Sequence, residues 1–292
     1  MHEIDSHTAV CGLLGYPIGH SVSPAIHNTL SERLGINMVY VPLAVEEDKL
    51  GTVIVGADGW KFPGMNVTIP YKEKVIPFCS ELDPFAEKIG AVNTLVRQEA
   101  GGYKGYNTDA PGLYRALKEE GMDPLDKEVI LLGAGGVAKA IAVLMVEKGA
   151  KRVYILNRTV EKAESLAAEC NRIAGRDLVI PMALSDYKEL TGSGYLAIQA
   201  TNIGMFPKED AVVIDDDAFY EKLDAGFDTI YNPAETVFMK KCRARGKKAV
   251  NGLKMLLYQG VIAYELWNNV SVPDELADQV YEKLCGILGT GK

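Results

Sequence analysis

Two kinds of apolar segment alternate along almost the whole chain. Short runs of roughly five apolar residues that end in glycine or a polar residue are typical of buried strands. Longer segments with apolar residues three and four positions apart are typical of amphipathic helices, and Ile26, Leu30 and Leu34 form such a stripe. The alternation predicts an α/β fold with largely parallel sheets.

Residues that start and stop helices locate these elements. In the first part of the chain, strands at 10–15 and 39–43 flank a helix that Ser23 caps, with Pro24 at its first position and Gly35 after its end. The same reasoning predicts strands at 128–132, 152–156, 197–200 and 226–230, and helices at 111–120, 137–148, from 160 onward, 252–267 and 273–288.

The length of 292 residues suits two domains, each with a sizeable core. We expect an α/β domain with a mostly parallel sheet at 1–109 and a second α/β domain at 110–250. The second domain already has a full set of strands and helices. The C-terminal helices, within 251–292, are therefore expected to return to the first domain.

Charge and composition exclude several functions. A net charge of -8 argues against a general nucleic-acid binder, so an anionic ligand needs local basic residues or helix N-termini. No secretory signal or membrane-spanning apolar run is visible, and we expect a cytoplasmic protein. The scattered cysteines predict neither a disulfide framework nor a zinc site, and these are Cys11, Cys79, Cys170, Cys242 and Cys285.

A strand, a glycine turn and a helix follow one another in residues 128–148. Gly133 makes the turn, Gly135 lets the backbone approach a pyrophosphate, and Ala138 takes the helix-packing position. The free N–H groups of the helix start favour an anion. A purely structural turn is the alternative, but the pattern favours a dinucleotide bound by Gly133, Ala134, Gly135, Gly136, Val137 and Ala138.

The end of the next strand bears on the choice of dinucleotide. NAD sites usually place a carboxylate there to hold the ribose 2′-hydroxyl. Here Leu156 is followed by Asn157, Arg158 and Thr159, with Lys162 one turn later. The two cations suit a 2′-phosphate, so the sequence favours NADP. The alternative is a helix start, capped by Thr159, with solvated basic residues.

The first domain carries four polar clusters at strand ends or helix starts, and the pattern continues through the second domain. The clusters are residues 15–24, 66–72, 90–94 and 105–109, followed by 157–159, 201–205, 228–233 and 251–259. Taken together they resemble shikimate dehydrogenase, in order and over nearly the whole chain. The resemblance implies reversible, NADPH-dependent reduction of 3-dehydroshikimate to shikimate, in the biosynthesis of chorismate and the aromatic amino acids.

The resemblance implies that 1–109 with 251–292 is the substrate-binding, catalytic domain and that 110–250 is the Rossmann-like, NADP-binding domain. It also assigns roles to single residues. Ser21 and Ser23 look like the pair that holds the substrate carboxylate, with Thr68 and Tyr231 reaching it as well. Hydroxyls beside a helix N-terminus form an anion site without a full positive charge. Ser23 has a structural alternative as the helix N-cap, whereas Ser21 has none that the sequence reveals.

Lys72 and Asp109 resemble the catalytic pair of that family. Reduction of a ketone needs one proton donor near its oxygen, and lysine can donate while an adjacent carboxylate orients it. Read singly, Lys72 could be a solvated helix residue and Asp109 a helix cap. We favour Lys72 as the acid and base, with Asp109 as its partner, although the sequence does not say which of them moves the proton.

Other residues complete the predicted sites. Asn93, Asp109 and Gln259 look like partners for the ring hydroxyls of the substrate. His20 and His27 lack metal-ligand spacing and are interpreted as structural hydrogen-bonding residues, so no metal is expected. The resemblance extends the predicted NADP contacts to Thr201, Asn202, Gly204, Met205, Gly252 and Met255.

Lys254 departs from the family, which usually has glycine there, and could alter local charge or touch a ligand. Rival functions are a quinate or quinate/shikimate dehydrogenase using NAD or NADP, and a non-catalytic NADP-binding sensor of the same fold. The serine pair, the missing carboxylate after Leu156 and the presence of both Lys72 and Asp109 favour the shikimate enzyme. Its expected partner is a small molecule, with no nucleic acid or membrane, and the chain is expected to be a monomer or a homodimer.

Overall fold

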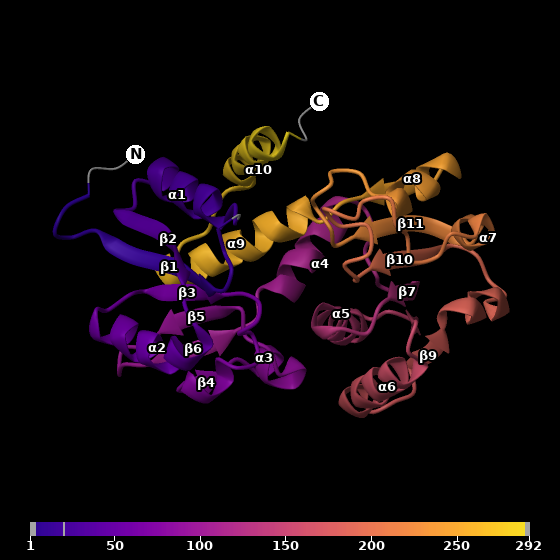
Figure 1. The fold of residues 1–292 in the computed structure, drawn as a ribbon, viewed down its shortest axis with the longest axis horizontal. Coiled ribbons are helices and arrows are strands. Elements are labelled where there is room, and N and C mark those ends of the chain that lie inside the picture. Colours follow the sequence, from indigo (N-terminus) through magenta and orange to yellow (C-terminus); the bar gives the residue numbers. More distant parts are fainter. Residues whose placement is uncertain (1–3, 20, 290–292) are drawn as a thin grey trace. The chain divides into compact units, whose positions relative to one another are not determined.

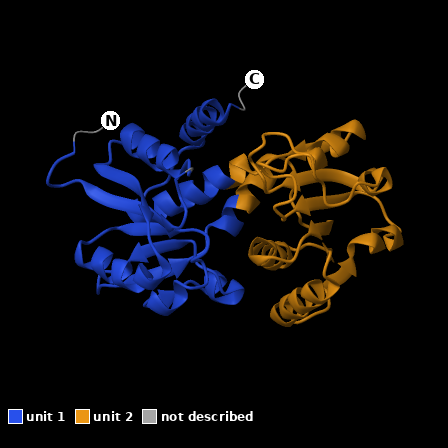
Figure 2. Cartoon of the chain, viewed as in Figure 1, with its two compact units in different colours: residues 1–112, 256–292 blue, residues 113–255 orange. Residues whose placement is uncertain are grey.

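The computed structural model describes residues 4–19 and 21–289, which form two compact units (Figure 2). Unit 1 comprises residues 1–112 and 256–292, and unit 2 comprises residues 113–255. The C-terminal segment therefore returns to the first unit, as expected. The chain passes between the units within helices α4 (Asp109–Glu119) and α9 (Leu253–Asn268).

Unit 1 is built on a six-stranded sheet of order β2-β1-β3-β5-β6-β4 (Figure 1). Its strands are β1 (Ala9–Gly15), β2 (Met38–Ala44), β3 (Gly64–Val67), β4 (Glu81–Leu82), β5 (Thr94–Arg97) and β6 (Tyr103–Tyr106). Only β5 runs against its neighbours, pairing antiparallel with β3 and β6. The sheet is thus mostly parallel, as predicted.

Helices pack on both faces of this sheet. On one face, α2 (Leu50–Gly59) and α3 (Pro84–Ile89) bury Leu50, Ile54 and Ala86 in a core with strand residues. On the other, α1 (Ser23–Leu34) and α9 bring aromatic rings together over β2, and α10 (Asp274–Leu288) packs on α1. Short 3-10 turns lie at Glu47–Lys49 and Ile76–Phe78.

Unit 2 is a doubly wound parallel sheet. Its order, β12-β11-β10-β7-β8-β9, is the dinucleotide-binding arrangement in which strand order reverses beside the first strand, here between β7 and β10. The strands are β7 (Glu128–Leu132), β8 (Arg152–Asn157), β9 (Val179–Ala183), β10 (Tyr195–Gln199), β11 (Leu223–Asp228) and β12 (Lys248–Val250).

The strands of unit 2 are almost continuously apolar because helices cover both of their faces. Helices α7 (Asp217–Glu221) and α8 (Val237–Ala244) place aromatic and sulfur side chains in the core on one side. Helices α5 (Gly136–Glu147) and α6 (Val160–Ala174) pack on β7 and β8, and a 3-10 segment occupies Leu184–Glu189.

The elements that the sequence predicted lie within a few residues of the observed ones, and one cap was wrong. The sequence did not locate β3, β4, β5, β6, β9, β12, α2, α3, α7 and α8. Val22 occupies the N-cap of α1 and Ser23 is already helical, so Ser23 does not cap the helix. Gly35 ends α1 in the left-handed conformation, as predicted. Helix α4 begins at Asp109 rather than 111, because a proline in the first turn lacks only an N–H that would have no helical partner there.

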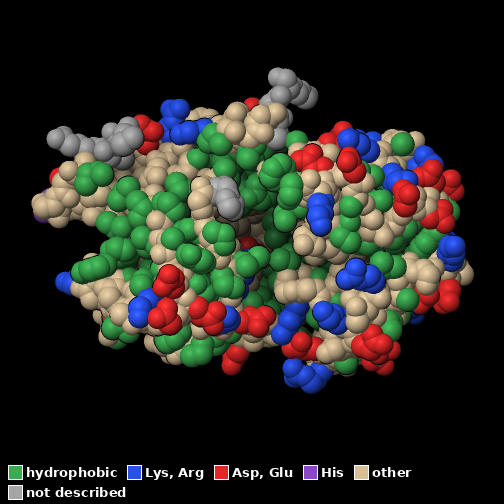
Figure 3. Space-filling model, in the orientation of Figure 1, with side chains coloured by type: hydrophobic (Ala, Val, Ile, Leu, Met, Phe, Trp, Pro, Cys, Tyr) green, Lys and Arg blue, Asp and Glu red, His purple; other side chains and the backbone are tan. Residues whose placement is uncertain are grey.

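Charges of both signs lie interspersed over unit 2 on the face seen in Figure 3. This mixture agrees with the expectation that a ligand anion must be met by local groups. Within residues 4–19 and 21–289, no helix combines the length and apolar character that crossing a bilayer requires, and no group of three or more His, Cys, Asp or Glu could hold a metal ion.

Candidate active site

The glycine turn of unit 2 connects β7 to α5. Gly133 has φ +111°, which other residues rarely adopt, and a Cβ there would lie 2.8 Å from the Thr201 methyl group. Gly135 is the N-cap of α5, and a Cβ at Gly135 or Gly136 would meet open space. Ala138 is fully buried, which suits close packing of the helix. The exposed turn leaves the N–H groups of the helix start accessible to an anion.

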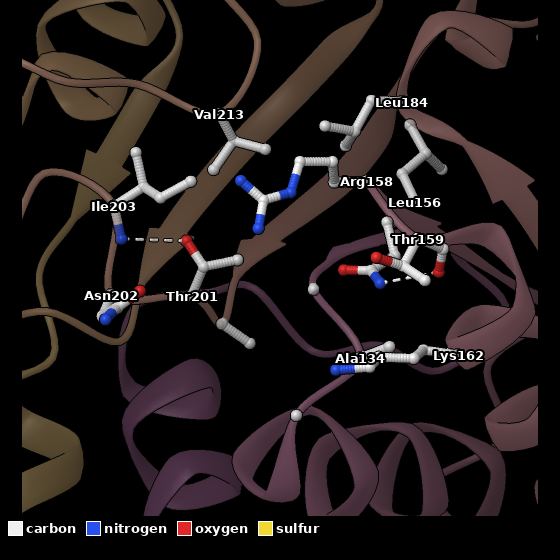
Figure 4. Close-up of a pocket in the computed structure, with 14 residues that line it drawn as sticks. Ala134, Leu156, Arg158, Thr159, Lys162, Leu184, Thr201, Asn202, Ile203 and Val213 are labelled. Carbon is white, nitrogen blue, oxygen red and sulfur yellow. Dashed lines mark hydrogen bonds between the residues drawn. The ribbon is translucent and has the colours of Figure 1, made fainter.

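A pocket of about 530 Å³ opens over this turn (Figure 4). It lies at the carboxyl ends of β7, β8 and β10, where strand order reverses and doubly wound folds bind ligands. Nine of the predicted cofactor contacts line it, and these are Gly133, Ala134, Gly135, Asn157, Arg158, Thr159, Lys162, Thr201 and Asn202. The remaining lining residues, Leu156, Leu184, Ala200, Ile203 and Val213, were not predicted.

Arg158 and Lys162 are the charged residues of this lining. In Figure 4 the guanidinium of Arg158 points into the pocket, toward Val213. Within the described part of the chain, neither cation has an ion pair with an acidic residue. Thr159 holds the N-cap position of α6, but its side chain makes no cap hydrogen bond. Asn157 fixes the segment by donating to the Thr159 carbonyl at 2.9 Å.

The other predicted cofactor contacts lie outside the pocket lining. Gly136, Val137 and Ala138 form the first turn of α5. Gly204 and Met205 continue the segment that follows β10, with Gly204 at φ +92° and Met205 exposed. Gly252 precedes α9 and donates its N–H to the Ile230 carbonyl at 2.9 Å, and Met255 lies buried within that helix.

In unit 1, Lys72 and Asp109 form the predicted pair. The Lys72 ammonium donates to a carboxylate oxygen of Asp109 at 2.7 Å, with 26% and 18% of the two side chains exposed. Lys72 lies in a turn after β3 and not in a helix. Asp109 is the first residue of α4, while the oxygen of Asn107 accepts from the first-turn N–H of Ala110 at 3.4 Å. The carboxylate of Asp109 therefore serves the lysine.

The two serines lie together at the start of α1. The Ser21 hydroxyl donates to Ser23 Oγ at 3.2 Å and accepts the backbone N–H of Ser23 at 3.2 Å. Ser21 therefore has a local structural role that the sequence did not reveal, whereas Ser23 does not cap the helix. Thr68 lies at the end of β3 and donates its backbone N–H to Leu14.

Asn93 is buried, and its side chain is hydrogen-bonded to neighbouring residues. Its oxygen accepts from the backbone of Thr108 at 2.7 Å, and its amide nitrogen donates to the Thr108 hydroxyl at 3.0 Å. An amide nitrogen has a second N–H, which is the group that could meet a substrate hydroxyl. Sequence reasoning missed the adjoining Asn66, which joins Tyr40, Thr94 and the Asn93 carbonyl in one buried network.

Gln259 lies on α9, against Gly112 of α4. A Cβ at Gly112 would lie 2.6 Å from the Gln259 backbone nitrogen, so only glycine permits this approach. The Gln259 amide donates to the Leu256 carbonyl at 2.8 Å. Tyr231, in unit 2, follows β11, and burial raises the pKa of its phenol, which stays protonated at neutral pH.

The interpretation of His27 as a hydrogen-bonding residue is wrong. The side chain is fully buried, and neither ring nitrogen has a hydrogen-bond partner among the residues that the structure describes. The ring instead stacks on Tyr40, with 4.1 Å between centroids. Burial lowers the pKa of His27 to about 3, an effect that the nearby Asn66 opposes in part. His20 lies outside the described residues.

A doubly wound sheet whose first glycine turn opens onto a basic pocket is the architecture of dinucleotide-dependent oxidoreductases, and the chain is a member of that class. It matches the shikimate dehydrogenase substrate binding domain at residues 13–95, the shikimate / quinate 5-dehydrogenase domain at 116–202 and the shikimate 5'-dehydrogenase C-terminal domain at 252–283. The chain belongs to the shikimate dehydrogenase family.

Individual relatives agree with this assignment. A shikimate dehydrogenase (NADP(+)) of Desulforamulus reducens is 42% identical over 283 residues, covering 96% of this chain and 97% of that protein. A crystal structure of a shikimate dehydrogenase in complex with NADP+ is 36% identical, with a TM-score of 0.87 and 97% of each chain covered. The Listeria monocytogenes enzyme in complex with shikimate and NAD is 32% identical, with a TM-score of 0.89 and 97% and 99% covered.

Proposed function

We propose that the chain catalyses the reversible reduction of 3-dehydroshikimate to shikimate with NADPH. The observation that carries this proposal is the ion pair between Lys72 and Asp109, held at 2.7 Å while both side chains stay partly open to solvent. Partly exposed ion pairs also occur elsewhere in this chain, as between Arg97 and Asp58, so exposure alone does not single out this pair, whereas its resemblance to the catalytic lysine and aspartate of the family does. A partly open pair on two anchored segments is suited to meeting a substrate oxygen.

The pocket of unit 2 fits the dinucleotide. Its open glycine turn leaves room for a pyrophosphate at the start of α5, and Arg158 and Lys162 offer two cations to a 2′-phosphate. An NAD site would favour a carboxylate at the end of β8, where this chain has Asn157. When bound, NADPH supplies the hydride that reduces the ketone carbon.

Two residues of the chain supply the proton and orient the proton donor and the substrate. Lys72 donates a proton to the ketone oxygen as the alcohol forms and takes it back in the reverse direction. Asp109 holds the ammonium in place through the 2.7 Å hydrogen bond and presents its second oxygen to a substrate hydroxyl. Loss of Lys72 leaves the developing alkoxide without its proton source, and loss of Asp109 leaves the Lys72 ammonium without the group that holds it in place.

Substrate recognition is assigned to polar side chains at the ends of strands and on helices α1, α4 and α9. Ser21, Ser23, Thr68 and Tyr231 bind the carboxylate, and Asn93, Asp109 and Gln259 bind ring hydroxyls. For Asn93 the group in question is the N–H left over from its bond to Thr108. A site that satisfies several hydroxyls rejects analogues that lack them, because its own polar groups would be left unpaired.

The decisive assay offers shikimate and quinate, each with NADP+ and with NAD+, and follows formation of the reduced cofactor. Shikimate with NADP+ is expected to give the highest kcat/KM. Turnover of quinate with NAD+ alone would contradict the proposal. Light scattering on the same preparation would measure its oligomeric state, which we expect to be a monomer or a homodimer. We expect the protein to act in the cytoplasm.

Lys72→Ala tests the assigned acid. It is expected to lower kcat by roughly a hundredfold or more while shikimate still binds. Lys74→Ala is the matched control, because Lys74 lies two residues on and pairs with Glu47 at 2.6 Å on the surface. Equal kcat in the wild-type chain and the Lys72 variant would remove Lys72 from the mechanism.

A further inference from the structure

A buried carboxylate in unit 2 is not used by the proposed chemistry. Asp228 ends β11 and has no exposed surface. Its oxygens accept from the Ile230 N–H at 3.0 Å, the Thr236 hydroxyl at 2.6 Å and the Gln199 amide at 3.3 Å. All three donors are neutral, and no ion pair of Asp228 occurs among the described residues.

Burial makes this carboxylate costly. It raises the pKa of Asp228 to about 6, although the bonds from Thr236 and Ile230 oppose the effect. Because the folded pKa of Asp228 lies above its unfolded value of 3.8, stability falls as the pH rises above 3.8, and this loss is complete once the pH exceeds about 6. At neutral pH the charge of Asp228 therefore lowers stability, and stability does not explain its presence.

The link from Asp228 to the dinucleotide pocket runs through Gln199. The two residues are register partners at the ends of β11 and β10, and Gln199 is 1% exposed. The Gln199 amide nitrogen donates to Asp228 and to the Ile203 carbonyl at 3.2 Å, and its oxygen accepts the Thr201 N–H. A carboxylate can only accept, so it fixes which end of the Gln199 amide carries the donors.

The segment that Gln199 holds is one wall of the pocket. Thr201, Asn202 and Ile203 all line it, and the Thr201 hydroxyl accepts the Ile203 N–H at 3.1 Å, the bond drawn in Figure 4. A second path runs from Asp228 to Ile230, whose carbonyl accepts the N–H of Gly252.

We propose that Asp228 is a positioning residue that, through Gln199, holds residues 201–203 in the shape that lines the dinucleotide pocket. This inference rests on the proposed function, because it concerns NADP binding at that pocket. A second consequence follows from the geometry. When Asp228 takes up a proton it becomes a donor, its hold on Gln199 weakens, and the affinity for NADP falls.

The surroundings of Asp228 leave it as the group that titrates. Burial raises the pKa of the Cys242 thiol to about 12 and raises that of the Tyr220 phenol above its ordinary value, so both stay neutral between pH 5 and 8. The charge of Asp228 also raises the pKa values of Cys242 on α8 and Tyr220 on α7. Gln199 and Thr236 do not ionise.

Asp228→Asn imitates the protonated carboxyl, and NADP+ binding would be measured by calorimetry on the full chain between pH 5.5 and 8.0. The variant is expected to bind about fivefold more weakly at pH 7.5, or roughly 1 kcal/mol, as expected when a charge-assisted bond becomes a neutral one. The affinity of the wild-type chain for NADP+ falls toward that of the variant below about pH 6, as Asp228 takes up a proton. The variant lacks this pH-dependent loss because asparagine does not titrate. Titration of the 2′-phosphate is common to both proteins and cancels in the comparison.

Stability separates positioning from a purely structural role. We expect the melting temperature of the Asp228 variant at pH 7.5 to be unchanged or raised, whereas a structural role alone lowers it and leaves NADP+ affinity intact. Asp216→Asn is the matched control. Asp216 caps α7 in the same unit through Ala218 at 3.0 Å, asparagine caps helices equally well, and we expect no change in affinity.

A double-mutant cycle tests the path through Gln199. Gln199→Met is expected to weaken NADP+ binding, and adding Asp228→Asn is expected to weaken it no further. Fully additive losses, or identical pH profiles in the wild-type chain and the Asp228 variant, would overturn the positioning role alone. A wild-type chain that does not bind NADP+ at all would overturn both this inference and the proposed function.

Discussion

The pH dependence of unit 1 stability is expected to depend on His27. Its ring is enclosed by Tyr40 and by Trp267, whose centroid lies 5.0 Å away. Burial lowers the pKa of His27 to about 3, from 6.5. In the unfolded chain the imidazole binds a proton near its ordinary pKa, so acid favours unfolding.

The magnitude follows from the difference between the two pKa values. Because the folded pKa is lowered, the contribution of neutral His27 is complete above about pH 6.5 and is lost as the pH falls toward 3. One pKa unit corresponds to about 1.4 kcal/mol, and pH 5.0 lies about 1.5 pH units below the unfolded pKa. The free energy of unfolding of unit 1 should therefore fall by about 2 kcal/mol between pH 7.5 and 5.0 from this residue.

The chain offers a probe that reports on unit 1. Its two tryptophans, Trp60 and Trp267, both belong to that unit. Urea unfolding followed by tryptophan fluorescence would be compared for the wild-type chain and His27→Phe, which keeps a ring for stacking but does not titrate. Phenylalanine also changes the side-chain volume and so the stability at every pH. The quantity compared is therefore the decrease in the free energy of unfolding between pH 7.5 and 5.0 in each protein. An equal fall in both proteins would refute the assignment.

Two further substitutions test the packing. Lys254 lies within 2.6 Å of both Glu119 and Glu120, so Lys254→Met is expected to destabilise unit 2 by about 1–2 kcal/mol in urea unfolding followed by circular dichroism. An unchanged midpoint would show that the cluster is solvated. A Cβ at Gly64 would lie 2.0 Å from the indole nitrogen of Trp267, so Gly64→Ala should cost about 3 kcal/mol or more, read by Trp267 fluorescence. A variant as stable as the wild-type chain would contradict that close contact.

The sequence predicted the βα units well because each is encoded locally. A glycine such as Gly35 indicates the end of a helix because it adopts the left-handed conformation there. A run of apolar residues such as 128–132 indicates a buried strand. The reversed direction of β5 has no such local signal. It follows from a short connection between β5 and β6, which lets two neighbouring strands pair antiparallel.

Site residues were harder to predict where their role depends on pairing across strands. Gln199 and Asp228 lie 29 positions apart, and only the register of β10 and β11 brings their side chains together. A buried aspartate at a strand end looks like any other polar residue there. The cap of α1 was mispredicted because local rules favour a serine before a proline as the N-cap, whereas Val22 takes that position and Ser21 accepts the N–H of Ser23.

The dinucleotide pocket shows how an acidic chain can still attract a polyanion. Across the chain the net charge is -8, yet the charged residues lining this pocket are Arg158 and Lys162. Another groove of unit 2, along α6, also contains two arginines, but Glu164 and Asp177 lie among its lining residues and balance them. Screening over about 8–10 Å at physiological salt makes this local balance matter more than the total. Two cations without an opposing carboxylate, beside the free N–H groups of α5, therefore favour a ligand with phosphate at both ends of its ribose.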